Sequence, residues 1–235
     1  MMLSVSQSLF ESVQQGLLPY LQIESVDPHN PIVVHHVPAP WQCLGTGNYA
    51  AVFTHPDYPE QVVKVYAPGR PGIEEEIEVY RRLGDHPAFS RCYGSGANFL
   101  ILQRLAGITL YDCLYRGITI APQVIHDIDA ALDYARSCGL VPHDVHGRNV
   151  MAQGDRGLVV DVSDFLHPSP CRAWRDVKRA YWWVYRPLVQ PLGLRVPYFL
   201  LDWVRSGYRL FRRWWPMPKQ PIRSKKRRRQ LFLRS

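Results

Sequence analysis

The chain has 235 residues, of which 46% are hydrophobic and 20% are charged, and its net charge is +8. This composition excludes a disordered chain, and no apolar run reaches the roughly 18 residues that a membrane-spanning helix needs. The five cysteines include no Cys-x-x-Cys pair, which argues against a zinc site or a disulfide framework and favours a cytoplasmic protein.

Residues 1–40 are predicted to form an N-terminal leader. Apolar residues between 8 and 21 have spacings compatible with a short helix, and prolines between 28 and 40 then interrupt any regular element. From Trp41 onward the pattern changes to short strands rich in β-branched and aromatic residues. These strands are expected at 41–44, 51–53 and 61–66.

Helical patterns dominate the second half of the chain. The expected order is a helix at 73–83, a strand at 98–105, a turn and helix at 107–114, a helix at 123–138, a strand at 157–162 and a helix at 171–185. This order predicts a small β-rich lobe followed by a helical lobe, with the seam near residues 103–107. The corresponding predicted domains are 41–105 and 106–196, followed by a C-terminal helix and tail at 197–235.

A glycine-containing turn separates the first two strands and reads Gly45-Thr46-Gly47-Asn48-Tyr49-Ala50-Ala51-Val52. Glycines let a backbone approach phosphate groups closely, and the N–H groups of such a turn can donate to phosphate oxygens. The same residues suit an ordinary hairpin turn. The pattern therefore indicates a phosphate-binding loop only in combination with other motifs.

A lysine and a set of carboxylates follow this turn. Lys64 alternates with valines in the strand at 61–66, 19 residues after Gly45. Taken alone, such a lysine would be expected to face solvent. The next helix opens with Glu74, Glu75 and Glu76, and carboxylates in a first turn also suit the positive end of the helix dipole.

The most informative segment runs from Val141 to Val150 and contains Asp144 and Asn149, and Asp161 follows at the end of an apolar run. Phosphoryl transfer from ATP uses one carboxylate to orient the attacking hydroxyl and accept its proton. It also uses an amide and a second carboxylate to hold Mg²⁺. Asp144, Asn149 and Asp161 would supply these groups, with Asp164 as an alternative register for the last one.

In order and spacing, these motifs resemble those of the protein-kinase-like superfamily over residues 44–165. The glycine turn is similar to G-x-G-x-x-G-x-V, with Ala50 in place of the third glycine. Lys64 resembles the lysine of V-A-I-K, and Asp144 to Asn149 resembles H-R-D-L-x-x-x-N. The resemblance implies an α+β, bilobal fold with a small β-rich N-lobe and a reduced helical C-lobe, because only 74 residues follow Asp161.

The resemblance also implies an ATP- and Mg²⁺-dependent kinase and a role for each matching residue. The implied catalytic residues are Asp144, Lys64 and Glu76, with Glu75 or Glu78 as alternatives to Glu76. The implied ATP contacts are Gly45, Gly47, Val52 and Lys64, together with backbone groups near Gln103 and Leu105. The implied Mg²⁺ ligands are Asn149 and Asp161.

Two departures from the family pattern concern the acceptor. Pro142 stands in place of the motif's histidine, and His146 stands where protein serine/threonine kinases usually have lysine. The order Asp-x-His-x-x-Asn is more similar to bacterial small-molecule and sugar kinases. We expect a serine/threonine protein kinase, with a sugar, lipopolysaccharide or other small-molecule hydroxyl as the alternative acceptor. The rival interpretations are an ATP-binding pseudokinase and a membrane or nucleic-acid adaptor.

The C-terminal tail differs in charge from the rest of the chain. From Trp203 onward there are twelve Lys and Arg and no Asp or Glu, which leaves 16 basic and 20 acidic residues in 1–202, a net charge of −4. Basic residues interleaved with tryptophan and phenylalanine suit an anionic membrane surface, and nucleic acid is a second candidate partner. Membrane binding would place the protein at the inner membrane face. Alternatively, the tail is a helix packed on the core with a solvated basic end, and it then needs no partner.

Overall fold

The computed structural model describes residues 2–27, 30–169, 171–200, 203 and 207. Residues 1–196 form one compact unit and residues 197–235 form a second. The second unit contains the basic aromatic tail predicted from the sequence, and most of it lies outside the described residues. The helices and strands with assigned bounds all lie in the first unit.

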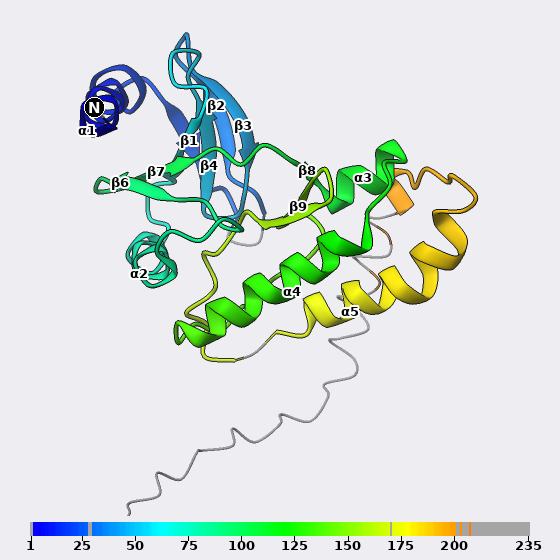
Figure 1. Cartoon of the computed structure of the whole chain (residues 1–235). Coiled ribbons are helices and arrows are strands. Elements are labelled where there is room, and N and C mark those ends of the chain that lie inside the picture. Colours follow the sequence, from blue (N-terminus) through cyan, green and yellow to red (C-terminus); the bar gives the residue numbers. More distant parts are fainter. Residues whose placement is uncertain (1, 28–29, 170, 201–202, 204–206, 208–235) are drawn as a thin grey trace, which may run out of the picture. The chain divides into compact units, whose positions relative to one another are not determined.

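An antiparallel sheet of five strands forms the N-lobe, in the order β3-β4-β5-β7-β6 (Figure 1). Helix α2 (Ile73–Leu83) connects β5 to β6, and its apolar residues pack against one face of the sheet. Strand β6 was not expected from the sequence, because its Gly94 and Ser95 weaken the strand pattern. The strands are β3 (Gln42–Thr46), β4 (Ala50–Thr54), β5 (Gln61–Tyr66), β6 (Cys92–Ser95) and β7 (Phe99–Gln103).

Strand β5 shows how both faces of this sheet become buried. Val63 and Val65 join a cluster with the N-terminal helix, whereas Val62 and Tyr66 join the larger cluster that includes α2. Successive side chains of a strand point to opposite faces, so Lys64 lies on the same face as Val62 and Tyr66. The strand thus presents one charged side chain toward α2, with valines on either side of it in the sequence.

The N-terminal segment covers the outer face of the sheet. Helix α1 (Met2–Ser12) continues into the π-helical segment η1 (Val13–Leu17), so the helix expected at 8–21 begins and ends earlier. Its residues Leu9, Val13 and Leu17 are spaced four apart, are at most 1% exposed and pack against the sheet. Two short strands, β1 (Gln22–Glu24) and β2 (Val33–His36), then pair with each other.

The C-lobe is built around helix α4 (Pro122–Ser137), which ends before Gly139 in its left-handed conformation. A small sheet of β8 (Ile108–Thr109), β9 (Val150–Gln153) and β10 (Arg156–Val159) packs beside it. The approach is closest at Gly157, where an added Cβ would lie 2.3 Å from the carbonyl oxygen of Val124. Helix α3 (Leu110–Arg116) connects β8 to α4.

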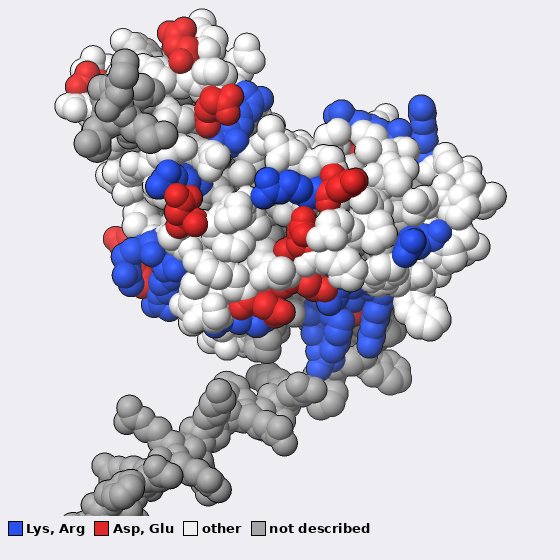
Figure 2. Space-filling model, viewed as in Figure 1, with Lys and Arg blue, Asp and Glu red and all other residues white. Residues whose placement is uncertain are grey.

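The last helices of the first unit pack along α4 (Figure 1). Helix α5 (Ala173–Ala180) continues into the π-helical segment η2 (Tyr181–Val189), which extends the helix expected at 171–185. Asp129 on α4 accepts hydrogen bonds from Trp174 Nε1 at 2.7 Å and Lys178 Nζ at 2.9 Å. On the face shown in Figure 2, basic side chains gather below α5, whose sequence includes three basic residues.

The two lobes meet where the backbone N–H of Val159 donates to the carbonyl of Ala88 at 2.8 Å. The α+β, bilobal arrangement predicted from the sequence, with a β-rich N-lobe and a helical C-lobe, is therefore confirmed. Among the described residues, no helix combines the length and apolar character required to cross a bilayer.

Candidate active site

Three charged side chains from different elements converge between the lobes. Lys64 on β5 lies 2.8 Å from Oε1 and 2.8 Å from Oε2 of Glu76 on α2. Its ammonium also lies 3.3 Å from Oδ1 of Asp161, which follows β10. The Lys64 side chain is 13% exposed and that of Glu76 is fully buried, whereas Asp161 is 39% exposed. The pairing involves Glu76 and not the neighbouring exposed Glu75.

Burial and charge act against each other in this group. Burial opposes the ammonium form of Lys64, but Asp161 and Glu76 together raise the pKa of this lysine above its ordinary value. Burial likewise opposes ionisation of Asp161, yet Lys64 and the Ser163 backbone N–H hold its pKa below the ordinary value. The fold therefore stabilises a cation at Lys64 and an anion at Asp161 at neutral pH.

Tyr66 is a member of this group that the motifs did not reveal. Its hydroxyl donates a hydrogen bond to Oε2 of Glu76 and lies 3.4 Å from the carbonyl oxygen of Gly72. Burial and the Glu76 carboxylate raise the pKa of Tyr66, so the hydroxyl stays a donor. The sequence signal was its position two residues after Lys64, on the same face of the strand.

The loop before β9 holds Asp144 and Asn149 close together. Asp144 has φ 51°, a left-handed conformation that is uncommon for residues other than glycine. The side-chain amide of Asn149 donates to the carbonyl oxygen of Asp144 at 3.0 Å, which ties the two ends of the loop. The Asp144 carboxylate is 53% exposed and lies 3.6 Å from Nε2 of His146.

A backbone hydrogen bond connects this loop to the carboxylate after β10. The N–H of Val160 donates to the carbonyl of Asn149 at 3.0 Å. The next residue is Asp161, whose Oδ1 also accepts from the backbone N–H of Ser163 at 3.1 Å. The structure therefore brings Asn149 and Asp161 onto neighbouring segments and connects Asp161 in turn to Lys64.

The alternative register at Asp164 has a different environment. Asp164 is half-buried, and its carboxylate makes no hydrogen bond or ion pair within the described part of the chain. Burial together with the charges of Asp161 and Asp144 raises its pKa, against the opposing effect of His143 and His167. Contact with Lys64 distinguishes Asp161 from Asp164.

The glycine turn joins β3 to β4. The backbone N–H of Gly47 donates to the carbonyl of Ala50 at 2.8 Å, and the carbonyl of Tyr49 accepts from Ala67 at 2.9 Å. An added Cβ on Gly45 would meet no heavy atom within 4 Å. Val52 on β4 pairs with Lys64 on β5. The pairing of these two strands therefore fixes the position of the glycine turn relative to Lys64.

The segment that links the lobes contains Gln103 and Leu105. The backbone N–H of Gln103 donates to Arg91 at 2.8 Å, and its carbonyl accepts from the hydroxyl of Ser90 at 3.0 Å. Like Tyr66, Ser90 makes a contact in this region that the sequence motifs did not indicate. Leu105, two residues later, is half-buried and lies outside the strands.

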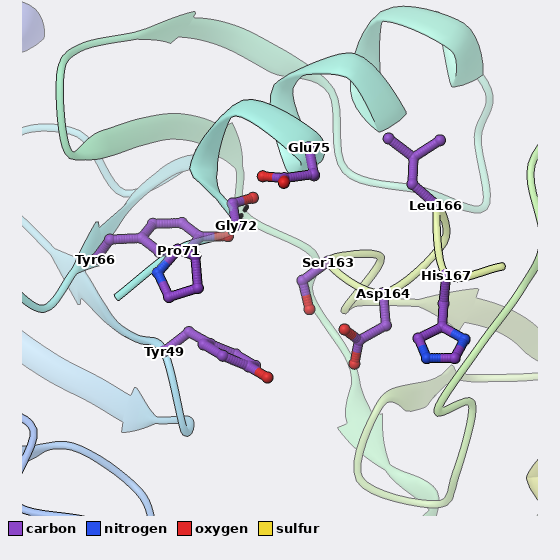
Figure 3. A pocket seen from close by; sticks show the side chains of 9 residues that line it. All are labelled: Tyr49, Tyr66, Pro71, Gly72, Glu75, Ser163, Asp164, Leu166 and His167. Carbon is purple, nitrogen blue, oxygen red and sulfur yellow. Dashed lines mark hydrogen bonds between the residues drawn. The ribbon is translucent and has the colours of Figure 1, made fainter. Parts of the chain in front are cut away.

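A cavity of about 220 Å³ opens beside the charged group (Figure 3). The N-lobe contributes Tyr49, Tyr66, Pro71, Gly72 and Glu75 to its wall, and the segment after Asp161 contributes Ser163, Asp164, Leu166 and His167. The side chains of Ser163 and Asp164 point across the opening toward Tyr49 (Figure 3). Tyr66 and Ser163 connect this wall to Glu76 and Asp161 respectively.

No protein-family model matches the chain. The chain is 30% identical over 169 residues to the "Putative serine/threonine-protein kinase YrzF" of Bacillus subtilis (strain 168), covering 71% of this chain and 78% of that protein. The chain belongs to the protein-kinase-like superfamily. The kinase-like resemblance predicted from residues 44–165 is therefore confirmed at the level of the family.

Solved protein kinases are also similar to this kinase-like chain. The Mycobacterium tuberculosis PknI kinase domain is 22% identical with a TM-score of 0.41, and the alignment covers 56% of this chain and 62% of that one. Rad53 in complex with AMP-PNP is 19% identical with a TM-score of 0.43, covering 51% of this chain and 36% of that one. The chain thus spans less than two thirds of either solved kinase.

Proposed function

We propose that the chain is an ATP- and Mg²⁺-dependent kinase that transfers the γ-phosphate to a serine or threonine hydroxyl of a protein. The observation that supports this most is the contact of Lys64 with Glu76 and Asp161. These residues come from three separate elements, and the contacts are 2.8 Å and 3.3 Å. A lysine paired with a helix glutamate beside a metal-binding aspartate is the arrangement that kinases use for phosphoryl transfer.

The residues present fit Mg²⁺ and ATP. Asp161 has a lowered pKa and so offers a carboxylate, and Asn149 uses its amide N–H₂ on Asp144 and keeps its side-chain oxygen for a ligand. Carboxylate and amide oxygens are ligands that Mg²⁺ prefers. When bound, Mg²⁺ would neutralise charge on the phosphates during transfer.

The chain's own groups would hold ATP at both ends. Lys64, kept cationic by its two carboxylates, would bind the α- and β-phosphates, and Glu76 would fix its position. The turn that contains Gly45 and Gly47 would cover the phosphates, because glycines let the backbone approach them closely, and Val52 would contact the base. Backbone groups of Gln103 and Leu105 would bind adenine between the lobes.

Asp144 would act on the acceptor. Its carboxylate is 53% exposed, so an acceptor hydroxyl can reach it, and the Asn149 amide holds its backbone in the left-handed conformation. The carboxylate would orient that hydroxyl and accept its proton as the bond to phosphorus forms.

One observation favours a second candidate, a kinase of a sugar or another small-molecule hydroxyl. His146 lies 3.6 Å from the Asp144 carboxylate, at the position where protein kinases usually have lysine. The ring would shape the acceptor side of the site differently from a lysine. Assays should therefore include protein acceptors and hydroxyl-bearing small molecules in parallel.

The test is transfer of labelled phosphate from ATP with Mg²⁺, comparing the wild type with Asp144→Asn. Removal of a catalytic acid or base commonly reduces rates by about 10²–10⁴-fold, and we expect a loss in that range. Asp133→Asn, at an exposed aspartate on α4, is the matched control and should keep full activity. Equal incorporation by the wild type and Asp144→Asn would contradict the assignment and favour the pseudokinase interpretation.

A further inference from the structure

Tyr66 is the last residue of β5, and its side chain points toward α2 from the same face as Lys64. The residue is 2% exposed, and its hydroxyl donates to Oε2 of Glu76. The Lys64 ammonium lies 5.8 Å from the centre of the Tyr66 ring, within the range of a cation–π contact. The tyrosine therefore contacts both members of the Lys64–Glu76 pair.

Glu76 needs more than one donor because its side chain is fully buried. A buried carboxylate is costly unless hydrogen bonds and an opposite charge compensate for its lost hydration. Lys64 supplies the charge, but the same ammonium also lies 3.3 Å from Asp161. The Tyr66 hydroxyl adds a neutral donor that binds Glu76 independently of Asp161.

The contacts of Tyr66 also reach the beginning of α2. Its hydroxyl lies 3.4 Å from the carbonyl of Gly72, the N-cap residue of the helix, which has φ 112°. The same carbonyl accepts the backbone N–H of Glu76 at 2.9 Å in the first helical turn. An added Cβ on Gly72 would lie 3.5 Å from the Tyr66 ring, so the ring packs directly under this turn.

We propose that Tyr66 is a positioning residue that holds Glu76 against Lys64 and keeps α2 in its assembled position without a separate activating event. The inference rests on the proposed function, because it concerns the regulation of the same nucleotide site. Where only the lysine holds the glutamate, loss of that one ion pair releases the helix. Here a second hydrogen bond from the strand holds the same carboxylate.

The test replaces Tyr66 by phenylalanine, which removes the hydroxyl and keeps the ring. A hydrogen bond to a charged group contributes roughly 1.5–3 kcal/mol, so we expect kcat to fall about tenfold or more, with the acceptor KM unchanged. Tyr80→Phe is the matched control. Tyr80 is also a buried tyrosine near Glu76, but it makes no hydrogen bond to Glu76 within the described residues. The kcat of Tyr80→Phe should therefore match that of the wild type.

The pH profile gives a readout that general destabilisation would not move. Burial raises the pKa of Glu76, while Lys64 and the Tyr66 hydrogen bond lower it, so Tyr66→Phe should raise it further. The acid limb of the kcat profile should then shift to higher pH, because Glu76 becomes protonated earlier. The titratable groups that face Glu76 are Lys64 and Tyr66 on β5, Tyr80 on α2, Cys92 on β6 and Asp161.

Two further measurements separate this inference from the proposed function. In a Glu76→Gln background, Tyr66→Phe should cause little additional loss, because residues that act through one another are not additive. Without ATP, amide hydrogen exchange in the first turn of α2 should be faster in Tyr66→Phe than in Tyr80→Phe. Unchanged exchange together with unchanged kcat would overturn the inference. If the wild type transfers no phosphate, but exchange is still faster in Tyr66→Phe than in Tyr80→Phe, only the proposed function is overturned.

Discussion

Asp161 and Asp164 lie three residues apart on one segment, yet they are held differently. Asp161 accepts from Lys64 and from the backbone of Ser163, and these contacts lower its pKa. Asp164 has no such partner within the described residues, and burial together with its neighbouring carboxylates raises its pKa. At this scale, the distribution of donors gives the two carboxylates different environments, and we propose Asp161 rather than Asp164 as the metal ligand.

Mg-ATP binding should therefore depend on Asp161 and not on Asp164. A ligand at about 100 times its Kd stabilises a protein by ~2.7 kcal/mol, which corresponds to roughly 5–10 °C for a chain of this size. We expect this rise in melting temperature for the wild type and Asp164→Asn, and a much smaller one for Asp161→Asn. The control is ATP with a chelator, and equal shifts for both variants would contradict the assignment of the metal ligand.

At the scale of elements, the contact between α4 and β10 fixes the strand that leads to Asp161. The backbone N–H of Gly157 donates to Asp127 at 3.0 Å, and an added Cβ would lie 2.3 Å from the Val124 carbonyl. Asp127 is in turn held by Gln123 at 2.7 Å. Helix and strand approach this closely only because residue 157 has no side chain.

Gly157→Ala should consequently destabilise the protein. Overpacking a core costs about 1–3 kcal/mol, and here the obstacle is backbone rather than a flexible side chain. Gly94→Ala in β6 is the matched control, since its Cβ would meet no atom within 4 Å. Urea unfolding should show a lower midpoint for Gly157→Ala only, and the same midpoint for both variants would show that α4 and β10 can separate without cost.

The elements that the sequence predicted best are those whose pattern is local. The alternation in 61–66 and the helical spacing in 73–83 match β5 and α2 in position. Comparison with the family pattern favoured Glu76 and left Glu75 and Glu78 as alternatives, and the structure pairs Glu76 with Lys64. The short strand β9 was not predicted from the sequence, and within the described residues it pairs with β8 and β10.

Parts of the site could not be predicted from the sequence because they depend on three-dimensional neighbours. The sequence places Tyr66 two residues after Lys64 on the same strand. Its hydrogen bond to Glu76, however, depends on where α2 lies after folding. Ser90 is separated from Gln103 by a whole strand and was not singled out by any pattern. The left-handed conformation of Asp144 accompanies the hydrogen bond from Asn149 to its carbonyl oxygen, a contact that the sequence pattern did not reveal.

At the scale of the whole molecule, the N-terminal helix belongs to the same packing unit as the sheet of the N-lobe. Leu9 and Leu17 are at most 1% exposed and share a cluster with Val63 and Val65, which flank Lys64 on β5. Residues 1–40 were expected to be a leader. Leu9, Val13 and Leu17 of this segment pack against the sheet, and sequence spacing alone could not assign that partner.

Leu9→Ala should therefore destabilise the N-lobe, because its side chain packs against the sheet. Truncating a fully buried leucine costs about 2–5 kcal/mol, so thermal unfolding should occur at a clearly lower temperature. Val26→Ala, at a residue that is 70% exposed, is the control and should change stability by less than ~0.5 kcal/mol. A Leu9→Ala protein as stable as the control would indicate that the helix is not part of the folding unit.

The cavity in Figure 3 has walls from both lobes, with Tyr49 and Glu75 on one side and Asp164 and His167 on the other. Any hinge motion of the lobes must therefore change its width. The NMR signal of a fluorine label on Tyr49 would report the width of this cavity, and therefore how far the lobes open. The same probe would record how far the molecule closes when nucleotide arrives, independently of the identity of the acceptor.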